Sequence, residues 1–253
     1  MVNKSKTDIN TFQQLSILIG QDGFLFYLHH QEPQKSISLD FIAINDILSS
    51  KSLNLFQKRL LDTIHNYQFD AVKLGFSNGF YSLIPQDYYE EQAKADYLKY
   101  NVKLFEEDQI VSEHIPTIKA YQVYIPLMNY HNALLDQVQE FEFEHFTHAL
   151  IKHAYPNTFE QTERLMVYIQ NTSLDIVAYE GRKFKLCNTF NYETDLDLVY
   201  YILFCVEQLH FNQRTLQLEL YHNSEDESAW LKMIKKYILN VKCEQKNLAS
   251  LVV

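Results

Sequence analysis

The chain is poor in the residues that interrupt or cross-link a protein. Its 253 residues include only 5 glycines, 5 prolines and 3 cysteines. No glycine follows Gly181, so a close approach of the later backbone to a ligand would need non-glycine residues in strained geometry. The cysteines, Cys187, Cys205 and Cys243, are odd in number and have no CxxC spacing. We therefore expect reduced structural thiols in a cytoplasmic protein.

Long apolar runs and excess positive charge are also missing. The longest uncharged apolar run, 198–206, is far shorter than the ~20 residues that cross a bilayer. Residues 1–14 are polar and lack the apolar core of a signal peptide. We expect neither secretion nor membrane insertion. The 22 Lys and Arg against 32 Asp and Glu give a net charge of -10, which repels phosphate backbones, so we expect no nucleic-acid partner.

What the chain does contain is enough apolar material for a large core. Hydrophobic residues make up 47% of it, which excludes a disordered chain. The first half begins with a predicted hairpin, 15–20 and 24–29, joined by Gln21, Asp22 and Gly23. A strand over 35–41, a helix over 53–67 and a strand over 70–76 follow from their periodicity. Weaker patterns predict a strand at 80–84, a helix at 86–97 and a strand at 120–125.

The second half repeats this order. Pro156 and Asn157 favour a turn, and we place a boundary there, between lobes 12–156 and 157–253. Alternating residues predict strands at 164–169, 174–178 and 184–190. Thr194, with Asp197 three residues later, predicts the capped start of a helix. A strand at 216–220 and a last helix carrying Trp230, Ile234 and Ile238 complete the pattern.

Two lobes, each with a three-strand meander followed by a helix and a strand, resemble the actin-like ATPase superfamily and its ribonuclease-H-like subdomains. The predicted fold class is therefore α/β with mixed sheets. With its QDGF turn and its RLMVYIQNTSLDIVAYEGRKFKLCNTF stretch, the chain is similar to an uncharacterised bacterial family of unknown function placed in that superfamily.

The resemblance implies where a nucleotide would bind. Active relatives hold ATP between the lobes, with a glycine-containing acidic turn between the first two strands of each lobe and a glycine pair after the later strand of the second lobe. Here the first turn keeps Gly20, Asp22 and Gly23. This turn fits a phosphate loop and also an ordinary hairpin, which we favour because Asp-Gly is a common hairpin signal.

The matching positions of the second lobe lack these residues. Its turn reads Gln170, Asn171, Thr172 and Ser173, with neither an acid nor a glycine. The segment that would follow its later strand reads Tyr221, His222, Asn223 and Ser224, again without glycine. We therefore expect no ATP turnover and assign no catalytic, cofactor-binding or metal-binding residue.

A cluster of Glu142, Glu144, His145, His148 and His153 is the strongest other candidate. His145 and His148 at i, i+3 could share one helix face and ligate a metal with a carboxylate. The acid lies outside any HExxH arrangement, so we favour a solvated helix face.

Neither the other histidines nor the cysteines predict a site. His29 and His30 end a strand, where adjacent side chains point to opposite faces and cannot share one site. None of the three cysteines has a neighbouring histidine in the sequence that would activate a nucleophile.

Aromatic residues suggest a binding surface. The chain has 18 Tyr and 17 Phe, some in doublets such as Tyr88 with Tyr89 and Tyr200 with Tyr201, although core packing explains most single aromatics. Our leading hypothesis is a non-enzymatic interaction or scaffold protein that binds a protein partner or forms a homodimer. The alternatives are a nucleotide-binding protein using Asp22 and a metal enzyme at His145 and His148.

Overall fold

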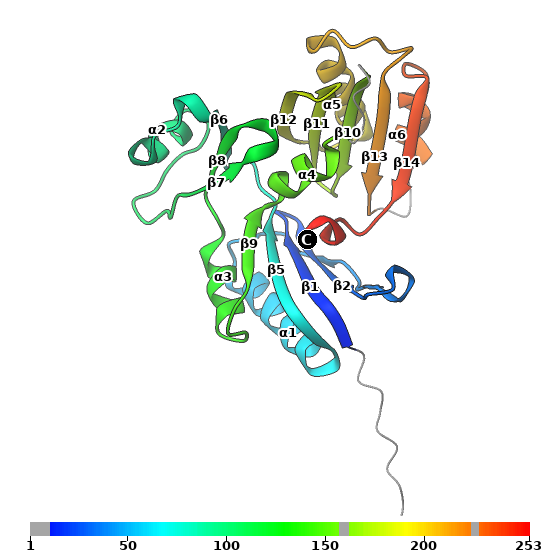
Figure 1. Cartoon of the computed structure of the whole chain (residues 1–253). Coiled ribbons are helices and arrows are strands. Elements are labelled where there is room, and N and C mark those ends of the chain that lie inside the picture. Colours follow the sequence, from blue (N-terminus) through cyan, green and yellow to red (C-terminus); the bar gives the residue numbers. More distant parts are fainter. Residues whose placement is uncertain (1–10, 157–161, 224–227) are drawn as a thin grey trace, which may run out of the picture.

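Two α/β lobes, each built on its own mixed sheet, make up the computed structural model, which describes residues 11–156, 162–223 and 228–253 (Figure 1). In the first lobe, β1 (Thr11–Ile19) and β2 (Gly23–His29) form the predicted antiparallel hairpin. After α1 (Ser50–Asn66), β5 (Gln68–Phe76) returns parallel to β1. β9 (Glu142–His145) then adds parallel to β5.

The prediction of one strand over 35–41 is wrong. The chain makes a 3-10 turn at Pro33–Lys35 and pairs with β2 through two short strands, β3 (Ile37–Ser38) and β4 (Ile42–Ala43). Between these strands the backbone leaves the ladder, and the ring of Phe41 packs on Gly23. The alternation of apolar residues was real, but this tertiary contact interrupts the pairing.

The second lobe repeats the strand order of the first. β10 (Glu163–Ile169), β11 (Ser173–Glu180) and β12 (Lys183–Asn191) form the predicted meander. The later elements are α5 (Asp195–Gln208), β13 (Gln217–His222), α6 (Ser228–Ile234) and β14 (Asn240–Gln245). The strand orders are β3-β2-β1-β5-β9 and β12-β11-β10-β13-β14, so both lobes have the same meander followed by two parallel strands.

The second-lobe predictions hold with two differences. The capping box of α5 is present, because the Thr194 hydroxyl and the Asp197 carboxylate each accept from the other's backbone amide. The last helix is shorter than predicted, so Ile238 lies beyond it but is still buried. The sequence analysis did not predict the strand β14.

A small third sheet lies between β5 and β9 in the sequence. Its strands are β6 (Tyr81–Pro85), β7 (Val111–Ile115) and β8 (Ala120–Tyr124), in the order β6-β8-β7. The predicted helix over 86–97 is wrong, because that segment holds two 3-10 turns (Gln86–Tyr88 and Glu91–Ala93) and the short α2 (Lys94–Leu98). The remaining elements are α3 (Met128–Leu135), α4 (Phe146–Ala154) and the 3-10 turns η4 (Pro116–Ile118) and η5 (Leu248–Leu251).

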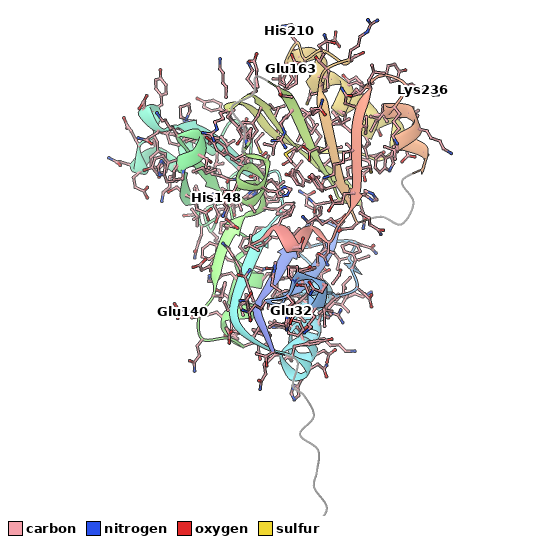
Figure 2. The ribbon with its side chains drawn as sticks, turned by 45° about the vertical axis from the view of Figure 1, so that its right-hand side comes forward. Glu32, Glu140, His148, Glu163, His210 and Lys236 are labelled. Carbon is pink, nitrogen blue, oxygen red and sulfur yellow. The ribbon has the colours of Figure 1, made fainter. Side chains whose placement is uncertain are left out.

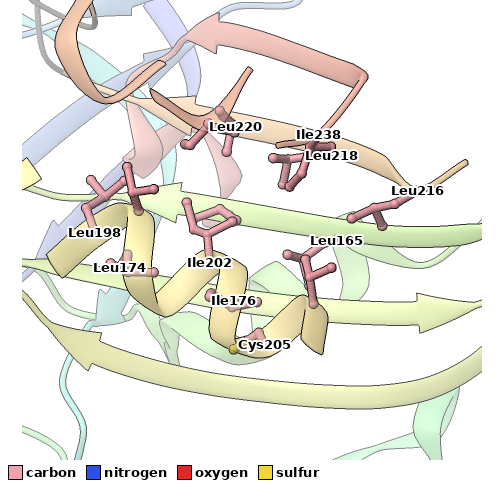
Figure 3. Packing of buried hydrophobic residues seen from close by; sticks show 14 of the residues in the cluster. Leu165, Leu174, Ile176, Leu198, Ile202, Cys205, Leu216, Leu218, Leu220 and Ile238 are labelled. Atoms are coloured by element: carbon pink, nitrogen blue, oxygen red, sulfur yellow. The ribbon is translucent and has the colours of Figure 1, made fainter. Parts of the chain in front are cut away.

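Three buried apolar clusters stabilise this arrangement. One joins the first sheet to α1 and α3, and a second joins the second sheet to α5 and α6. In the second cluster, Leu198, Ile202 and Cys205 of α5 lie over the sheet (Figure 3). The third cluster joins the inner faces of both sheets to α4 and η5. Burial of apolar surface therefore stabilises the contact between the lobes as well as each lobe.

The last residues of the chain return to the first sheet. The carbonyl oxygen of Val252 accepts hydrogen bonds from Gln14 Nε2 at 2.9 Å and from Ser16 Oγ at 2.5 Å. Gly75 makes room for this segment, since a Cβ there would lie 2.8 Å from Val252 Cγ2. The division of the chain at 156/157 stays a prediction, and residues 157–161 lie outside the described residues.

Replacing Ile202 tests the core beneath α5. Ile202 is fully buried, so we expect Ile202→Ala to lower the free energy of unfolding by about 2–5 kcal/mol in urea denaturation. Leu196 on the same helix is 68% exposed, and Leu196→Ala should change it by no more than about 0.5 kcal/mol. Equal losses in the two variants would contradict this packing.

Candidate functional site

The β1–β2 turn of the first lobe meets the β10–β11 turn of the second. The backbone amides of Asn171 and Thr172 lie close enough to the Asp22 carboxylate to stabilise its charge. Gln170 Nε2 donates to Ser77 Oγ at 2.6 Å, which adds a second polar contact between the lobes. A Cβ on Gly20 would lie 2.9 Å from Gln170 Oε1, so this glycine allows the two turns to approach.

Little space remains between the two turns. A cavity of about 10 Å³ is lined by residues of both turns together with Leu18, Leu25, Phe41 and Asn223. This volume is close to that needed by a single water molecule. The position that the resemblance gives to polyphosphate is therefore filled by the protein's own side chains and backbone.

Phe41 explains why the first turn needs its second glycine. A Cβ on Gly23 would lie 2.3 Å from a carbon of the Phe41 ring and 2.4 Å from the carbonyl oxygen of Ile42. No other residue type fits that approach, because real Cβ atoms do not come so close to other heavy atoms. Gly23 thus accommodates an aromatic ring of its own lobe.

Burial raises the pKa of Asp22, and the backbone amides that donate to its carboxylate partly oppose this rise. Within the described part of the chain, its Oδ2 atom is buried without a hydrogen-bond partner. This atom is the one polar feature of the first turn that the contacts between the lobes leave unsatisfied.

A second acid, Asp175, lies behind the turn of the second lobe. Its carboxylate accepts from Gln170 Nε2 at 3.1 Å and from Thr189 Oγ1 at 2.6 Å. Thr189 Oγ1 is also hydrogen bonded to the Tyr81 hydroxyl at 3.2 Å, which extends the network to the small sheet β6-β8-β7, called the inserted sheet below. Burial raises the pKa of Asp175 to about 6, and the two donors only partly oppose that rise.

Sequence analysis missed Asp175. The signal was present, because an acid stands inside the apolar run 174–178 of β11, which is buried along almost its whole length. The alternation that predicted the strand used Leu174, Ile176 and Ala178 and left the intervening acid unassigned. In the structure α4 covers the face of β11 that carries this acid.

The pH dependence of stability tests the burial of Asp175. Its pKa in the folded state, about 6, lies above the ordinary 3.8, so the folded state binds the proton more tightly than the unfolded state. The free energy of unfolding should fall as pH rises from about 4 to about 6 by on the order of 3 kcal/mol. Asp175→Asn removes this contribution.

Urea denaturation of both proteins at pH 4.5 and pH 7 measures the difference. We expect the stability of Asp175→Asn relative to the unmodified chain to increase between about pH 4 and about pH 6. Asp62→Asn, on the exposed face of α1, serves as the control. Parallel pH profiles for the unmodified chain and Asp175→Asn would show that burial does not raise the pKa of the Asp175 carboxyl group.

The resemblance implies a glycine pair after the later strand of the second lobe. That strand, β13, extends further than predicted and includes Tyr221 and His222. Tyr221 stacks on Tyr168, with ring centroids 5.3 Å apart, and His222 is buried. Asn223 follows the strand and lines the small cavity, while Ser224 lies outside the described residues. Only Asn223 of this segment therefore reaches the contact between the turns.

The cluster of acids and histidines is divided by the structure. Glu142 and Glu144 belong to β9, and α4 begins after His145, so the predicted shared helix face is wrong. His145 is buried with Nδ1 2.8 Å from Thr147 Oγ1 and Nε2 3.1 Å from the Asn78 carbonyl oxygen. Burial lowers the pKa of His145 to about 3.

Glu144 and His148 do come together. His148 is labelled in Figure 2. His148 Nδ1 lies 2.9 Å from Glu113 Oε2 and 3.6 Å from Glu144 Oε2. Glu144 is buried and also pairs with Lys152 at 3.1 Å and Lys73 at 3.5 Å. The prediction that this cluster lies on a solvated helix face is therefore also wrong, because these side chains form a partly buried network.

His153 lies apart from this network, hydrogen bonded to the Tyr168 hydroxyl at 2.8 Å. Among the described residues, no three His, Cys, Asp or Glu side chains are arranged to hold a metal ion. His29 is hydrogen bonded to Ser16 at 2.8 Å, and the ring of His30 packs on Phe12.

No disulfide joins the three cysteines, all of which lie in the described part of the chain. Burial raises the thiol pKa of Cys187 well above its usual range and that of Cys205 to about 12. Both thiols are therefore poor nucleophiles at neutral pH, since the thiolate is the reactive form.

Replacing Glu144 tests the charge network. Lys73 is only 13% exposed and contacts both Glu144 and Glu142, of which Glu142 is 82% exposed. We expect Glu144→Gln to lower the free energy of unfolding by about 2–4 kcal/mol, because it leaves a largely buried cation without its buried acid. Glu142→Gln, the matched control, should change it by no more than about 0.5 kcal/mol. Similar effects of both variants would contradict the assignment.

Residues 3–241 match the family described as "Protein of unknown function (DUF3822)". The chain belongs to this family. No curated protein matches it. No helix in the described part of the chain is long and apolar enough to cross a membrane.

Among solved structures, a Bacteroides thetaiotaomicron protein described as having an actin-like ATPase fold and unknown function is similar to this DUF3822 chain. The TM-score is 0.76 at 21% identity, over 100% of this chain and 99% of that one. The PilM-PilN type IV pilus biogenesis complex matches with a TM-score of 0.64 at 10% identity, over 95% and 90% of the chains.

The ethanolamine utilization protein EutJ of Carboxydothermus hydrogenoformans matches with a TM-score of 0.51 at 10% identity, over 94% of this chain and 86% of that one. These likenesses, with the repeated strand order, confirm the predicted fold class. The DUF3822 chain has the actin-like ATPase fold.

Proposed function

We propose that this protein is a non-enzymatic interaction or scaffold protein on an actin-like fold whose nucleotide site has become a structural contact between the lobes. The observation that carries the proposal is the close contact between the two turns. The backbone amides of Asn171 and Thr172, the kind of donor that a phosphate group would need, lie against the Asp22 carboxylate and stabilise its charge.

The available volume supports the same function. Pockets that hold drug-sized ligands have roughly 300–1,000 Å³, whereas the cavity between these turns has about 10 Å³. Opening it for a nucleotide would require moving Phe41 away from Gly23 and breaking the bond between Gln170 and Ser77. Such an opening exposes apolar surface and unpaired polar groups, both of which cost free energy.

Exposed aromatic residues support binding to another protein or to a second copy of the chain. In each of the two doublets one ring is largely exposed. Tyr89 stacks on Tyr121 and Tyr201 stacks on Phe190, whereas Tyr88 is 75% exposed and Tyr200 is 59% exposed. Exposed tyrosines are common in the energetically important parts of interfaces. PilM, a neighbour in fold, was solved as a complex with PilN.

The alternative, a divergent nucleotide-binding protein, has one observation in its favour. Asp22 Oδ2 has no partner among the described residues, and Asp22 lines the cavity, so this atom could serve a ligand if the turns separated. Titration of the chain with ATP therefore has to discriminate between a scaffold and a nucleotide-binding protein.

Isothermal titration of the full chain with ATP and MgCl₂ is the test. We expect no saturable heat and no shift in the melting temperature at millimolar nucleotide, although a ligand at 100 times its Kd would stabilise the fold by about 2.7 kcal/mol. Saturable binding that Asp22→Ala removes and Asp40→Ala, a change in the nearby exposed acid, retains would contradict the proposal.

Light scattering and cross-linking in the source cells test the interaction itself. We expect either self-association or cross-links to a defined protein from photoreactive groups placed at Tyr88 or Tyr200. A strict monomer with no cross-linked partner would count against a scaffold role.

A further inference from the structure

A groove of about 580 Å³ lies between the inserted sheet and the second lobe. Its walls are β6 with the neighbouring Tyr97, Tyr100 and Asn101 on one side, and residues 187–189 of β12 on the other. Figure 1 shows β6 and β12 next to each other at the junction of their sheets. The groove is far larger than the cavity between the turns and does not include any residue of those turns.

Both walls of the groove are strands at the edge of a sheet. β6 ends the order β6-β8-β7, and β12 ends the order β12-β11-β10-β13-β14, so each has one edge without a partner strand. Edge strands present unpaired N–H and C=O groups that another extended segment can pair with. Proteins usually blunt such edges, and β6 does so at its end with Pro85.

The hydrogen-bond pattern shows which groups of β12 face outward. Tyr192 N–H donates to the Thr172 carbonyl oxygen, which sets the phase of the antiparallel ladder between β11 and β12. Because bonded pairs alternate, Asn188 bonds to β11, whereas the backbone groups of Cys187 and Thr189 point away from it. The Thr189 amide is already taken, since it donates to Asn188 Oδ1 at 3.0 Å.

The chemistry of the lining selects the class of ligand. None of the residues that line the groove carries a formal charge in a chain of net charge -10, so neither phosphate nor a highly charged partner is recognised there by ion pairing. Tyrosine, serine, asparagine and threonine supply aromatic faces and neutral hydrogen-bonding groups. Free strand edges beside aromatic side chains are the features that bind extended peptides by strand addition.

We propose that an extended, largely uncharged peptide segment of a partner protein binds in this groove as an added strand on the free edge of β12. β12 accepts the segment because it has nine residues, whereas β6 has five and ends at a proline without an N–H. The floor is already rigid, because the Tyr81 hydroxyl is hydrogen bonded to Thr189 at 3.2 Å and lies 3.8 Å from Cys187 Sγ. Tyr100, which is 84% exposed, covers the peptide from the β6 side.

This inference rests on the proposed function and adds the place and the class of partner. A second copy of the chain could also pair along β12. A groove with walls on both sides holds a single extended segment more readily than the edge of another folded sheet, so we commit to a peptide.

The probe is a synthetic peptide obtained by panning a phage-displayed linear dodecapeptide library on the immobilised full chain. Its affinity is measured by fluorescence anisotropy. We expect Tyr100→Ala to weaken binding by about tenfold, the equivalent of about 1.4 kcal/mol for an aromatic contact at an interface. Tyr237→Ala, which removes an exposed tyrosine of the second lobe outside the groove, should leave the affinity unchanged.

N-methylation of the peptide tests the strand pairing directly and leaves the protein unaltered. Methyl groups on the amides that face β12 should weaken binding by about tenfold or more, because each removes a hydrogen bond and introduces a clash. Methyl groups on the alternate amides should be tolerated, which gives a period of two.

Several outcomes would contradict peptide binding in the groove. These are a panned library without peptides enriched above a blank surface, equal effects of Tyr100→Ala and Tyr237→Ala, and N-methyl effects without alternation. Self-association that substitutions on β12 abolish would instead assign the edge to a second copy. If cross-links form from Tyr88 or Tyr200 but no peptide binds, the scaffold function is supported and only peptide binding in the groove is contradicted. ATP binding that depends on Asp22 would overturn the scaffold function separately.

Discussion

The contact between the two hairpin turns is the constraint on which the arrangement of this protein depends. Both turns follow the first strand of a lobe, and the fold brings them to the same position between the sheets. The Asp22 carboxylate of one turn then lies against the backbone amides of the other, and Gln170 donates a hydrogen bond to Ser77. The backbone amides of the second turn and the space between the turns are taken up by the protein itself. The lobes are therefore in contact at the place where the resemblance to actin-like ATPases predicts a nucleotide.

Apolar burial and polar bonding act together in this contact. The cluster between the lobes includes α4, the inner faces of both sheets and the final residues of the chain. Val252 fills the position opposite Gly75 and accepts hydrogen bonds from two side chains of β1. A buried acid, Asp175, is tolerated nearby because neutral donors surround it, whereas the equally buried Glu144 is matched by cations. These two solutions follow from the high cost of burying an unpaired carboxylate.

The inserted sheet connects both features to the molecular surface. Tyr81 of β6 reaches the network of Asp175 through Thr189, so the inserted sheet is positioned against the second lobe by buried polar contacts. The same positioning leaves the edges of β6 and β12 on either side of a groove. The small cavity between the turns and the larger groove beside β12 are thus consequences of one packing arrangement.

Periodicity along the sequence determined the elements whose signals are local. The hairpin at Asp22, the meander of the second lobe and the capped start of α5 were predicted because turn residues, alternation and capping depend on neighbours in the chain. Predictions over 35–41 and 86–97 were wrong, because Phe41 packs on Gly23 and the second segment forms only short turns beside β6.

Only the tertiary structure decided what the candidate residues contact. The sequence placed Glu144, His145 and His148 together, but the end of β9 turns His145 inward and leaves the other two in a charge network with Lys73 and Lys152. It gave no sign that Asp22 would bind amides of the other lobe, because those partners are distant along the chain. The sequence by itself determined the order of strands and the absence of phosphate-binding glycines. Which edges remain free and which cavities close depend on long-range packing, which one-dimensional patterns do not record.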